Sequence, residues 1–299
     1  MRAFSRREFL TNWAANGAAA GFLMAASREL HASPLGIPIG SQTYPHRQRI
    51  KNGDFAGLCQ DMAALGIGQV ELCSPAYSEF ARLTDGKQVR RIVEDHGLIC
   101  RSGHFSMGEL RTKQQQAIEW AHDIGMSQMG TASLNGPLHN GTTTMDAVKR
   151  AADEYNKIGE VAARAGMQQF LHDEEFEMSK VDGRLTYEVL LKMLDPKLVQ
   201  MQFQMSAMRA VGDHVMYFMK YPGRFLSMHL QGVDLNPPAS GAGAGPGARG
   251  RAEVAVGKDS LDWPKIFTAA KTGGVKNYFL EQNWDLTVQG VAYLKTLKV

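Results

Sequence analysis

Four short apolar runs in the second half of the chain each end on a polar side chain that can bind a metal ion or a sugar hydroxyl. The runs read QQFL, QMQF, FLSM and NYFL, and the residues that follow them are His172, Gln204, His229 and Glu281. Imidazole and carboxylate groups are common ligands of divalent metals, whereas the amide of Gln204 stands where a carboxylate is expected. The intervening segments are long enough for a helix and its loops, so the sequence predicts that the four side chains converge.

The elements that must position these residues form a repeating pattern. Strand-like runs alternate with segments of helical periodicity, and several of those segments end in Gly, the usual C-terminal stop of a helix. Eight strand–helix repeats predict a parallel sheet closed into a (β/α)8 TIM barrel of one domain, with a doubly wound open sheet as the alternative. The expected strands cover residues 37–43, 68–73, 98–103, 127–132, 167–172, 199–204, 225–230 and 277–282.

A barrel places its functional side chains at the carboxyl ends of its strands. The polar residues of this chain fall at those positions, and neither a G-x-G-x-x-G after the first run nor a G-x-x-x-x-G-K-[ST] motif is present. Nucleotide-binding folds are therefore disfavoured. The residues expected around one barrel mouth are Tyr44, Glu71, His104, His172, Gln204, His229 and Glu281.

The bulk composition suits one large core and excludes some partners. The chain has 299 residues, 44% of them hydrophobic, and a formal net charge of +3. No basic patch of the kind that binds nucleic acid is evident, so a polyanionic partner is not expected. The three cysteines, Cys59, Cys73 and Cys100, are widely spaced among apolar neighbours, which predicts buried free thiols rather than disulfides.

Residues 1–32 have the character of an export leader. Residues 5–10 read SRREFL, and residues 13–26 form an apolar stretch of small residues that is too short to span a membrane. This pattern resembles a twin-arginine signal, which predicts a periplasmic protein that contacts the membrane only during export. Cleavage would follow Ala26 or Ala32, and a solvated basic arm is the alternative interpretation.

Residues 236–252, with the sequence NPPASGAGAGPGARGRA, differ in composition from the rest of the chain. A segment this rich in Gly, Ala and Pro cannot bury enough apolar surface to order itself. We expect a flexible loop on the active face, after the strand that carries His229. Both a lid and a neutral insertion fit this expectation, since long surface insertions cost little stability.

Six segments, taken together and in order, resemble a known family. They read VELCSPAYSEF, GLICRSGHF, FLHDEEF, LLKMLDPKLVQMQFQMSAMRAVG, GRFLSMHLQGVD and AVGKDSLDWPKIFTAAKTGGVKNYFLEQ, and the resemblance runs from about residue 37 to the end. The chain is similar to the sugar phosphate isomerase/epimerase family of xylose isomerase-like TIM barrels. This resemblance implies a sugar substrate and a divalent metal, often Mn²⁺, held at the barrel mouth by residues of the later strands.

The resemblance also implies which residues hold that metal. His172 falls on the second histidine of an HNHDFEF-like segment, whose first histidine is replaced by Phe170. Gln204 falls on the aspartate of an ELD-type segment, and Glu281 falls on a glutamate in a VEQ-like setting. The histidine of an HLKD segment is kept as His229. The implied metal ligands are thus His172, Gln204, His229 and Glu281.

Two departures from the family pattern bear on the metal. Gln204 replaces an aspartate, and Gln231-Gly232 replace a lysine and an aspartate. A site with one carboxylate carries about one negative charge, which favours Mn²⁺, Zn²⁺ or Fe²⁺ over Mg²⁺ or Ca²⁺. Because the lost charge stands at ligand distance, the site is expected to be weak, retuned or empty.

With a metal in place, the expected chemistry is proton transfer next to the carbonyl of a sugar or keto-sugar, through an enediolate. Glu281 is the predicted base and His172 its partner on the opposite face. Each further candidate also has a structural interpretation: a bonded structural histidine, an ion pair with a nearby Arg, or core packing. The residues predicted to bind the sugar are Tyr44, Glu71, His104 and Trp284.

Three functions follow, in decreasing order of support. The first is a metal-dependent sugar isomerase or epimerase. The second is a catalytically degenerate barrel that binds a carbohydrate or a partner protein, which the Gln204 and Gln231 departures allow. The third, phosphodiester cleavage as in abasic-site endonucleases, needs more metal ligands and a basic groove than this sequence supplies. Whether the chain forms a homo-oligomer is left open, because fold resemblance does not carry such properties.

Overall fold

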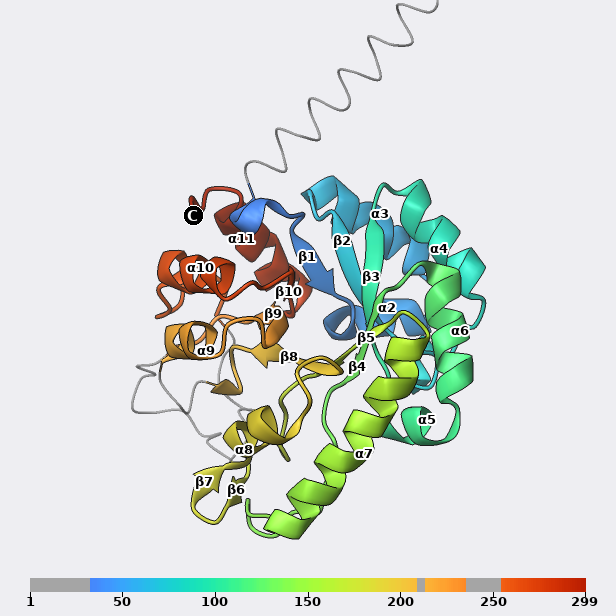
Figure 1. The fold of residues 1–299 in the computed structure, drawn as a ribbon. Coiled ribbons are helices and arrows are strands. Elements are labelled where there is room, and N and C mark those ends of the chain that lie inside the picture. Colours follow the sequence, from blue (N-terminus) through green and yellow to red (C-terminus); the bar gives the residue numbers. More distant parts are fainter. Residues whose placement is uncertain (1–32, 209–212, 235–253) are drawn as a thin grey trace, which may run out of the picture.

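The computed structural model describes residues 33–208, 213–234 and 254–299 (Figure 1). The expected leader (residues 1–32) and the Gly/Ala/Pro-rich loop (residues 236–252) lie outside the described residues, so both remain predictions. Eight parallel strands close into a barrel in the order β1-β10-β9-β8-β5-β4-β3-β2, which confirms the (β/α)8 fold. They are β1 (Gly40–Gln42), β2 (Gln69–Cys73), β3 (Ile99–His104), β4 (Gln128–Thr131), β5 (Gln168–Leu171), β8 (Val199–Gln204), β9 (Phe225–Leu230) and β10 (Asn277–Leu280).

The strands are buried along nearly their whole length. All six residues of β9 and all five of β2 are buried. This pattern is typical of parallel sheets, because helices cover the outer face while side chains fill the interior. Since the buried inner face includes polar residues such as Glu71 and Gln202, the barrel interior contains a polar layer as well as an apolar one.

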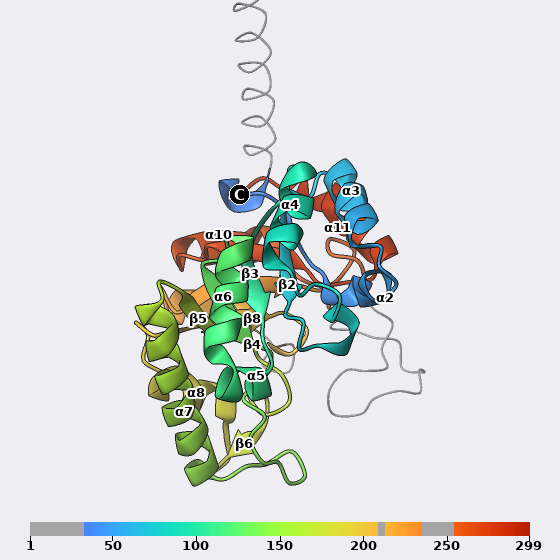
Figure 2. The ribbon, with the colours of Figure 1, turned by 90° about the vertical axis from the view of Figure 1, so that its right-hand side faces the viewer.

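Helices surround the barrel and run between consecutive strands (Figures 1 and 2). Several end as expected: α3 and α6 stop at Gly66 and Gly125, whose positive φ angles of 90° and 93° suit glycine. A small antiparallel hairpin, β6 (Lys180–Val181) with β7 (Arg184–Leu185), precedes α8. The helices are α2 (Arg47–Lys51), α3 (Phe55–Leu65), α4 (Gly86–Asp95), α5 (Met107–Thr112), α6 (Gln114–Ile124), α7 (Met145–Arg164), α8 (Thr186–Met193), α9 (His214–Lys220), α10 (Trp263–Thr272) and α11 (Trp284–Leu294), with 3₁₀ turns η1 (Pro34–Gly36), η2 (Tyr44–His46) and η3 (Ser78–Phe80).

The cysteines and the helices agree with the expectations from composition. Cys59, Cys73 and Cys100 are all buried and free. Within the described ranges, no helix combines the length and the apolar character needed to cross a bilayer.

Candidate metal centre at the barrel mouth

Glu71 lies at the centre of a buried hydrogen-bond network inside the barrel. Its Oε1 accepts from Ser102 Oγ at 2.5 Å and from Gln202 Nε2 at 2.9 Å. Its Oε2 lies 2.5 Å from Nε2 of His229 and 3.2 Å from Nε2 of His104. Each carboxylate oxygen therefore faces two donors, and the side chain is fully buried (0% exposed).

Gln202 and two serines extend this network and were not among the predicted site residues. Gln202 accepts at 2.8 Å from His104 Nε2 and donates at 2.9 Å to Ser227 Oγ. Gln202 precedes Gln204 by two positions, and Ser102 and Ser227 precede His104 and His229 in the same way. Because side chains two apart on a strand share a face, this period-two spacing is the signal that identifies them.

The four predicted ligands come together on the solvent side of that network. Gln204 Nε2 donates at 2.6 Å to Glu281 Oε2, and His229 Nδ1 lies 3.2 Å from the same oxygen. The rings of His172 and His229 have centroids 4.7 Å apart. Gln231, on the strand end after His229, also donates at 3.0 Å to Glu281 Oε2. Convergence of the strand-end residues is thus a feature of the fold.

Several buried polar atoms in this group have no hydrogen-bond partner among the described residues. They are His172 Nδ1, Gln204 Oε1 and Asp173 Oδ2. Asp173 Oδ1, by contrast, accepts from the backbone N–H of Gln204 at 2.9 Å. Buried polar groups are nearly always bonded, so unpaired donor and acceptor atoms at a strand mouth indicate an absent ligand or water.

The electrostatics make the ring of His229 charged and the ring of His172 neutral. Burial favours neutral His229, but Glu281 and Glu71 overcome it and raise the pKa of His229 to about 10. Burial also opposes ionisation of Glu281, yet the charge and hydrogen bond of His229 lower its pKa to about 2. For His172, burial and the neighbouring His229 and His104 hold the pKa well below the usual range. His172 is therefore neutral and can offer a lone pair.

A second arrangement of possible ligands uses His104. One nitrogen each of His104, His172 and His229 lies within 4.8 Å of the others, and all three rings are buried. In the structure, His104 Nε2 is bonded to Gln202. His172 and His229 belong to both ligand sets, which makes them the fixed part of any metal centre at this mouth.

Tyr44 and Trp284 lie at the ends of β1 and β10, which are neighbours in the barrel. Tyr44 is 39% exposed, with the guanidinium of Arg47 4.4 Å from its ring centroid. The Trp284 ring packs edge-on against His46 with a centroid distance of 5.7 Å. Their role in sugar binding stays a prediction.

Glu71 and His104, the other two residues predicted to bind sugar, occupy a different environment. Glu71 is 0% and His104 4% exposed, and both are bonded to protein partners. Glu71 is paired with His104 and His229 rather than with Arg47 or Arg101. Their burial favours a role in positioning His229 over direct contact with a sugar.

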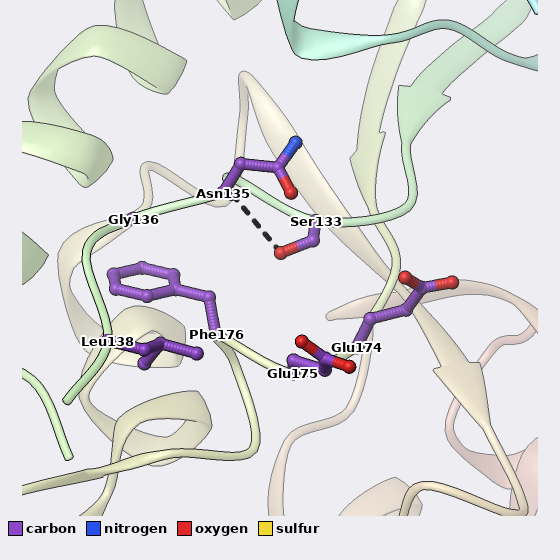
Figure 3. Close-up of a pocket in the computed structure, with 7 residues that line it drawn as sticks. All are labelled: Ser133, Asn135, Gly136, Leu138, Glu174, Glu175 and Phe176. Atoms are coloured by element: carbon purple, nitrogen blue, oxygen red, sulfur yellow. Dashed lines mark hydrogen bonds between the residues drawn. The ribbon is translucent and has the colours of Figure 1, made fainter. Parts of the chain in front are cut away.

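A cavity of about 320 Å³ lies between the loops that follow β4 and β5 (Figure 3). The second of these loops begins at His172, so the chain that lines the cavity continues directly from one of the candidate metal ligands. Buried Glu177 ties the two loops together: its Oε1 accepts from Leu134 N at 2.9 Å and its Oε2 from Glu174 N at 3.2 Å. The lining residues are Ser133, Asn135, Gly136, Leu138, Glu174, Glu175 and Phe176.

Together, the fold and these residues define a (β/α)8 barrel with a histidine-rich polar centre at the carboxyl ends of its strands. The sequence matches no protein-family model and no curated protein. Among solved structures, the chain resembles a sugar phosphate isomerase/epimerase from Parabacteroides distasonis, with TM-score 0.69, 20% identity, and coverage of 86% of this chain and 93% of that one.

Two further structures have the same fold. An L-ribulose 3-epimerase aligns with TM-score 0.62 and 14% identity over 87% of this chain and 91% of its own. The IOLI protein, solved with a bound zinc atom, aligns with TM-score 0.61 and 11% identity over 86% of this chain and 96% of its own. At these identities the likeness shows the shared (β/α)8 barrel fold alone, and function has to be argued from the site.

Proposed function

We propose that the protein is a metal-dependent isomerase or epimerase that moves a proton next to the carbonyl of a sugar or keto-sugar. The observation that carries this proposal is the pair of unpartnered buried atoms, His172 Nδ1 and Gln204 Oε1, beside an ionised Glu281. A nitrogen lone pair, an amide oxygen and a carboxylate are donors that suit a divalent cation. The sugar-processing structural neighbours, as well as the zinc in one of them, support the same conclusion.

The residues that would hold the metal are His172, Gln204, His229 and Glu281, with His104 in place of Gln204 and Glu281 as the second arrangement. A cation between His229 and Glu281 would take the place of the proton that His229 now holds, since metal binding displaces protons from its ligands. Mn²⁺, Zn²⁺ and Fe²⁺ accept such nitrogen and oxygen donors better than Mg²⁺ or Ca²⁺ do.

The buried network explains how His229 would present the correct nitrogen. Glu71 accepts from His229 Nε2 and thereby leaves Nδ1 facing Glu281 and the mouth. A carboxylate behind a ligating histidine fixes the ring and its tautomer. In this proposal Glu71 and His104 act as positioning residues rather than as sugar ligands.

When bound, a divalent metal supplies Lewis acidity that makes the C–H next to a carbonyl more acidic. Glu281 is ionised at physiological pH and can accept that proton, although a carboxylate of pKa about 2 is a weak base. His172 is neutral, and with its Nδ1 on the metal it would donate its other ring proton rather than accept one. In this proposal Tyr44 and Trp284 hold the sugar at the rim.

Metal analysis combined with isotope exchange tests the proposal. Purified full-length protein should contain stoichiometric Mn, Zn or Fe, and should exchange deuterium from D₂O into one member of a panel of ketoses, detected by mass spectrometry. A chelator should abolish the exchange, and added Mn²⁺ should restore it. Protein that lacks metal, does not bind added Mn²⁺ and exchanges no sugar would contradict the proposal.

The alternative function is a catalytically degenerate barrel that binds a carbohydrate or a partner. One observation favours it: Gln204 and Gln231 both donate to Glu281, so this carboxylate is satisfied by the protein alone. Sugar binding without metal and without exchange is the outcome that would establish this alternative.

We also propose that the chain is exported through its twin-arginine segment to the periplasm. Replacing Arg6 and Arg7 by Lys should leave the protein in the cytoplasmic fraction, whereas the unmodified chain should appear, shortened, in the periplasmic fraction. Equal distribution of the two proteins would contradict this proposal. A nucleic-acid partner remains unexpected.

A further inference from the structure

We propose that the substrate is an uncharged, phosphate-free carbohydrate, and that the cavity between the β4 and β5 loops binds one of its hydroxylated units. This inference rests on the proposed function for the reaction at the metal centre. It concerns binding, however, and is tested by binding. Two features of the described residues support it: the capping and acidic side chains at the helix N-termini, and the polar and apolar side chains that line the cavity.

The places where a barrel normally binds phosphate are already occupied by side chains of this protein. Phosphate binds at helix N-termini, where free N–H groups and the helix dipole attract it, and in barrels most often after the last two strands. At the start of α10, Asp262 accepts from Lys265 N at 3.2 Å. At the start of α11, Asn283 accepts from Leu286 N at 3.2 Å, and Asp285 lies in the first turn. Each site is thus capped and carries a negative charge.

Five other helices carry a carboxylate at their start, whereas α2, α3 and α6 have neither a side-chain cap nor an acidic residue in the first turn. Asp85 and Asp213 cap α4 and α9 through their side chains. Helices α5, α7 and α8 each carry an acidic residue in the first turn, namely Glu109, Asp146 and Glu188. A phosphate dianion at any of these five ends would meet a carboxylate, which opposes its binding there.

Arg47, which lies beside the aromatic rim formed by Tyr44 and Trp284, is already bonded to protein groups. Arg47 stacks on the Tyr44 ring, donates to Tyr44 O at 3.0 Å and lies 3.7 Å from a carboxylate oxygen of Glu79. Recognition of phosphate by arginine needs the guanidinium fork to be available. Arg47 therefore stabilises the aromatic rim rather than an anion.

The cavity has the two faces that a sugar ring presents. Figure 3 shows the Phe176 ring and Leu138 on one side, with Ser133 and the carboxylates of Glu174 and Glu175 on the other. Carboxylate and hydroxyl oxygens bond sugar hydroxyls, while an aromatic face packs on the C–H face of the ring. A volume of about 320 Å³ falls in the lower part of the roughly 300–1,000 Å³ range of small-molecule sites, enough for one sugar unit.

Binding of neutral sugars and of their phosphate esters tests the proposal directly. Full-length protein is screened by saturation-transfer NMR against unphosphorylated mono- and disaccharides and against the 6-phosphates of the same monosaccharides, and calorimetry then gives the affinities. We expect at least one neutral sugar to bind, and its ester to bind at least tenfold more weakly. An ester that binds equally well or more tightly, or the absence of binding by every neutral sugar, would overturn the proposal.

Variants of the cavity wall locate the binding. Asn135→Gly should weaken a bound disaccharide about tenfold, and glycine is chosen because φ of 52° at this position lies in the left-handed region. Glu175→Arg should tighten binding of the ester at least tenfold. Glu119→Gln, at an exposed position of α6, is the matched control and should change neither affinity. Wall variants that bind every sugar as the unmodified protein does would show that the cavity is not a subsite.

The outcomes of the two proposals are distinguishable. Deuterium exchange into a sugar phosphate would support the proposed reaction and overturn the inference about the substrate. Binding of a neutral disaccharide that is weakened by Asn135→Gly, in a protein that exchanges no deuterium, would support the inference and overturn the proposed reaction.

Discussion

The barrel mouth holds two groups of polar side chains that differ in how completely they are bonded. The inner layer is Glu71 with Ser102, His104 and Gln202; both oxygens of Glu71 face donors, and both ends of the Gln202 amide are bonded. The outer layer, at the carboxyl ends of the strands, is His172, Gln204, Gln231 and Glu281. It keeps buried atoms without a partner among the described residues, on His172 and Gln204. His229 joins the two layers, with one ring nitrogen facing each.

The difference separates support from function. A fully bonded buried network fixes side chains in one arrangement and needs nothing further, whereas a partly bonded one costs free energy until a ligand completes it. The inner layer therefore supports the fold, and the outer layer is where we propose that a ligand binds. Substitutions in the inner layer should reduce stability first, and those in the outer layer should change metal affinity first.

The largest effect is expected from Glu281→Ala in the outer layer. This change removes the one carboxylate that Gln204, Gln231 and His229 all contact. We expect affinity for Mn²⁺ or Zn²⁺, measured by calorimetry, to fall at least about a thousandfold, or about 4 kcal/mol. Glu175→Gln, at an exposed acid outside both layers, is the control. Affinity within tenfold of the unmodified protein would remove Glu281 from the metal centre.

The next effect is expected from Glu71→Gln in the inner layer. The amide nitrogen of glutamine would face a donor, either His229 Nε2 or Gln202 Nε2, and leave it unpaired in a fully buried place. We expect the free energy of unfolding in urea to fall by about 3–4 kcal/mol, and metal affinity by about 10- to 100-fold because His229 loses its orienting partner. Glu119→Gln should stay within about 0.5 kcal/mol. Unchanged stability would show that the inner layer does not support the fold.

Glu177 extends the comparison to an acid that is fully bonded but held in an apolar place. Burial, only partly offset by the bonds from Leu134 N and Glu174 N, raises the pKa of this carboxyl from its ordinary value of 4.5 to about 7. Between these two values the folded chain keeps a proton that the unfolded chain has released. Stability from this group is therefore full below pH about 4.5 and is lost as pH rises to about 7, by roughly 3 kcal/mol.

The measurement for Glu177 is urea unfolding at a series of pH values between 4 and 8. The unfolding free energy of the unmodified protein minus that of Glu177→Gln should fall by roughly 3 kcal/mol over this interval, since only glutamate titrates. A pH-independent difference would mean that the Glu177 carboxyl is ionised in the folded protein and that burial does not raise its pKa. Glu177 also bridges the loops around the cavity.

The fold was predictable because its signal is repeated. Eight runs such as VELC and FLSMHL alternate with helical segments that end in glycine, and each expected strand contains the observed one to within a few residues. Repetition makes each element support the next, so an error in one boundary does not change the topology.

The site was only partly predictable, for a physical reason. The strand-end positions of His172, His229 and Glu281 follow from chain order and the barrel rule. The depth of Glu71, by contrast, depends on the tilt and stagger of neighbouring strands, and no local pattern shows that two histidines and a glutamine from other strands reach its carboxylate. The substrate-binding roles of Tyr44 and Trp284 depend on a ligand that sequence does not specify.

The smallest effect, and the sharpest test of the comparison, is expected from Gln204→Asp. Gln204 now donates to Glu281 at 2.6 Å and leaves its Oε1 unpaired, so the outer layer is held together without a metal but incompletely. Aspartate removes the donor and adds a negative charge beside Glu281, which should destabilise the metal-free protein and tighten Mn²⁺ binding about tenfold, or about 1.4 kcal/mol. Gln204→Ala, which removes the donor without adding charge, should not tighten it. If calorimetry gives the same affinity for Gln204→Asp as for the unmodified chain, Gln204 is not a metal ligand, and the His104, His172 and His229 arrangement holds the metal.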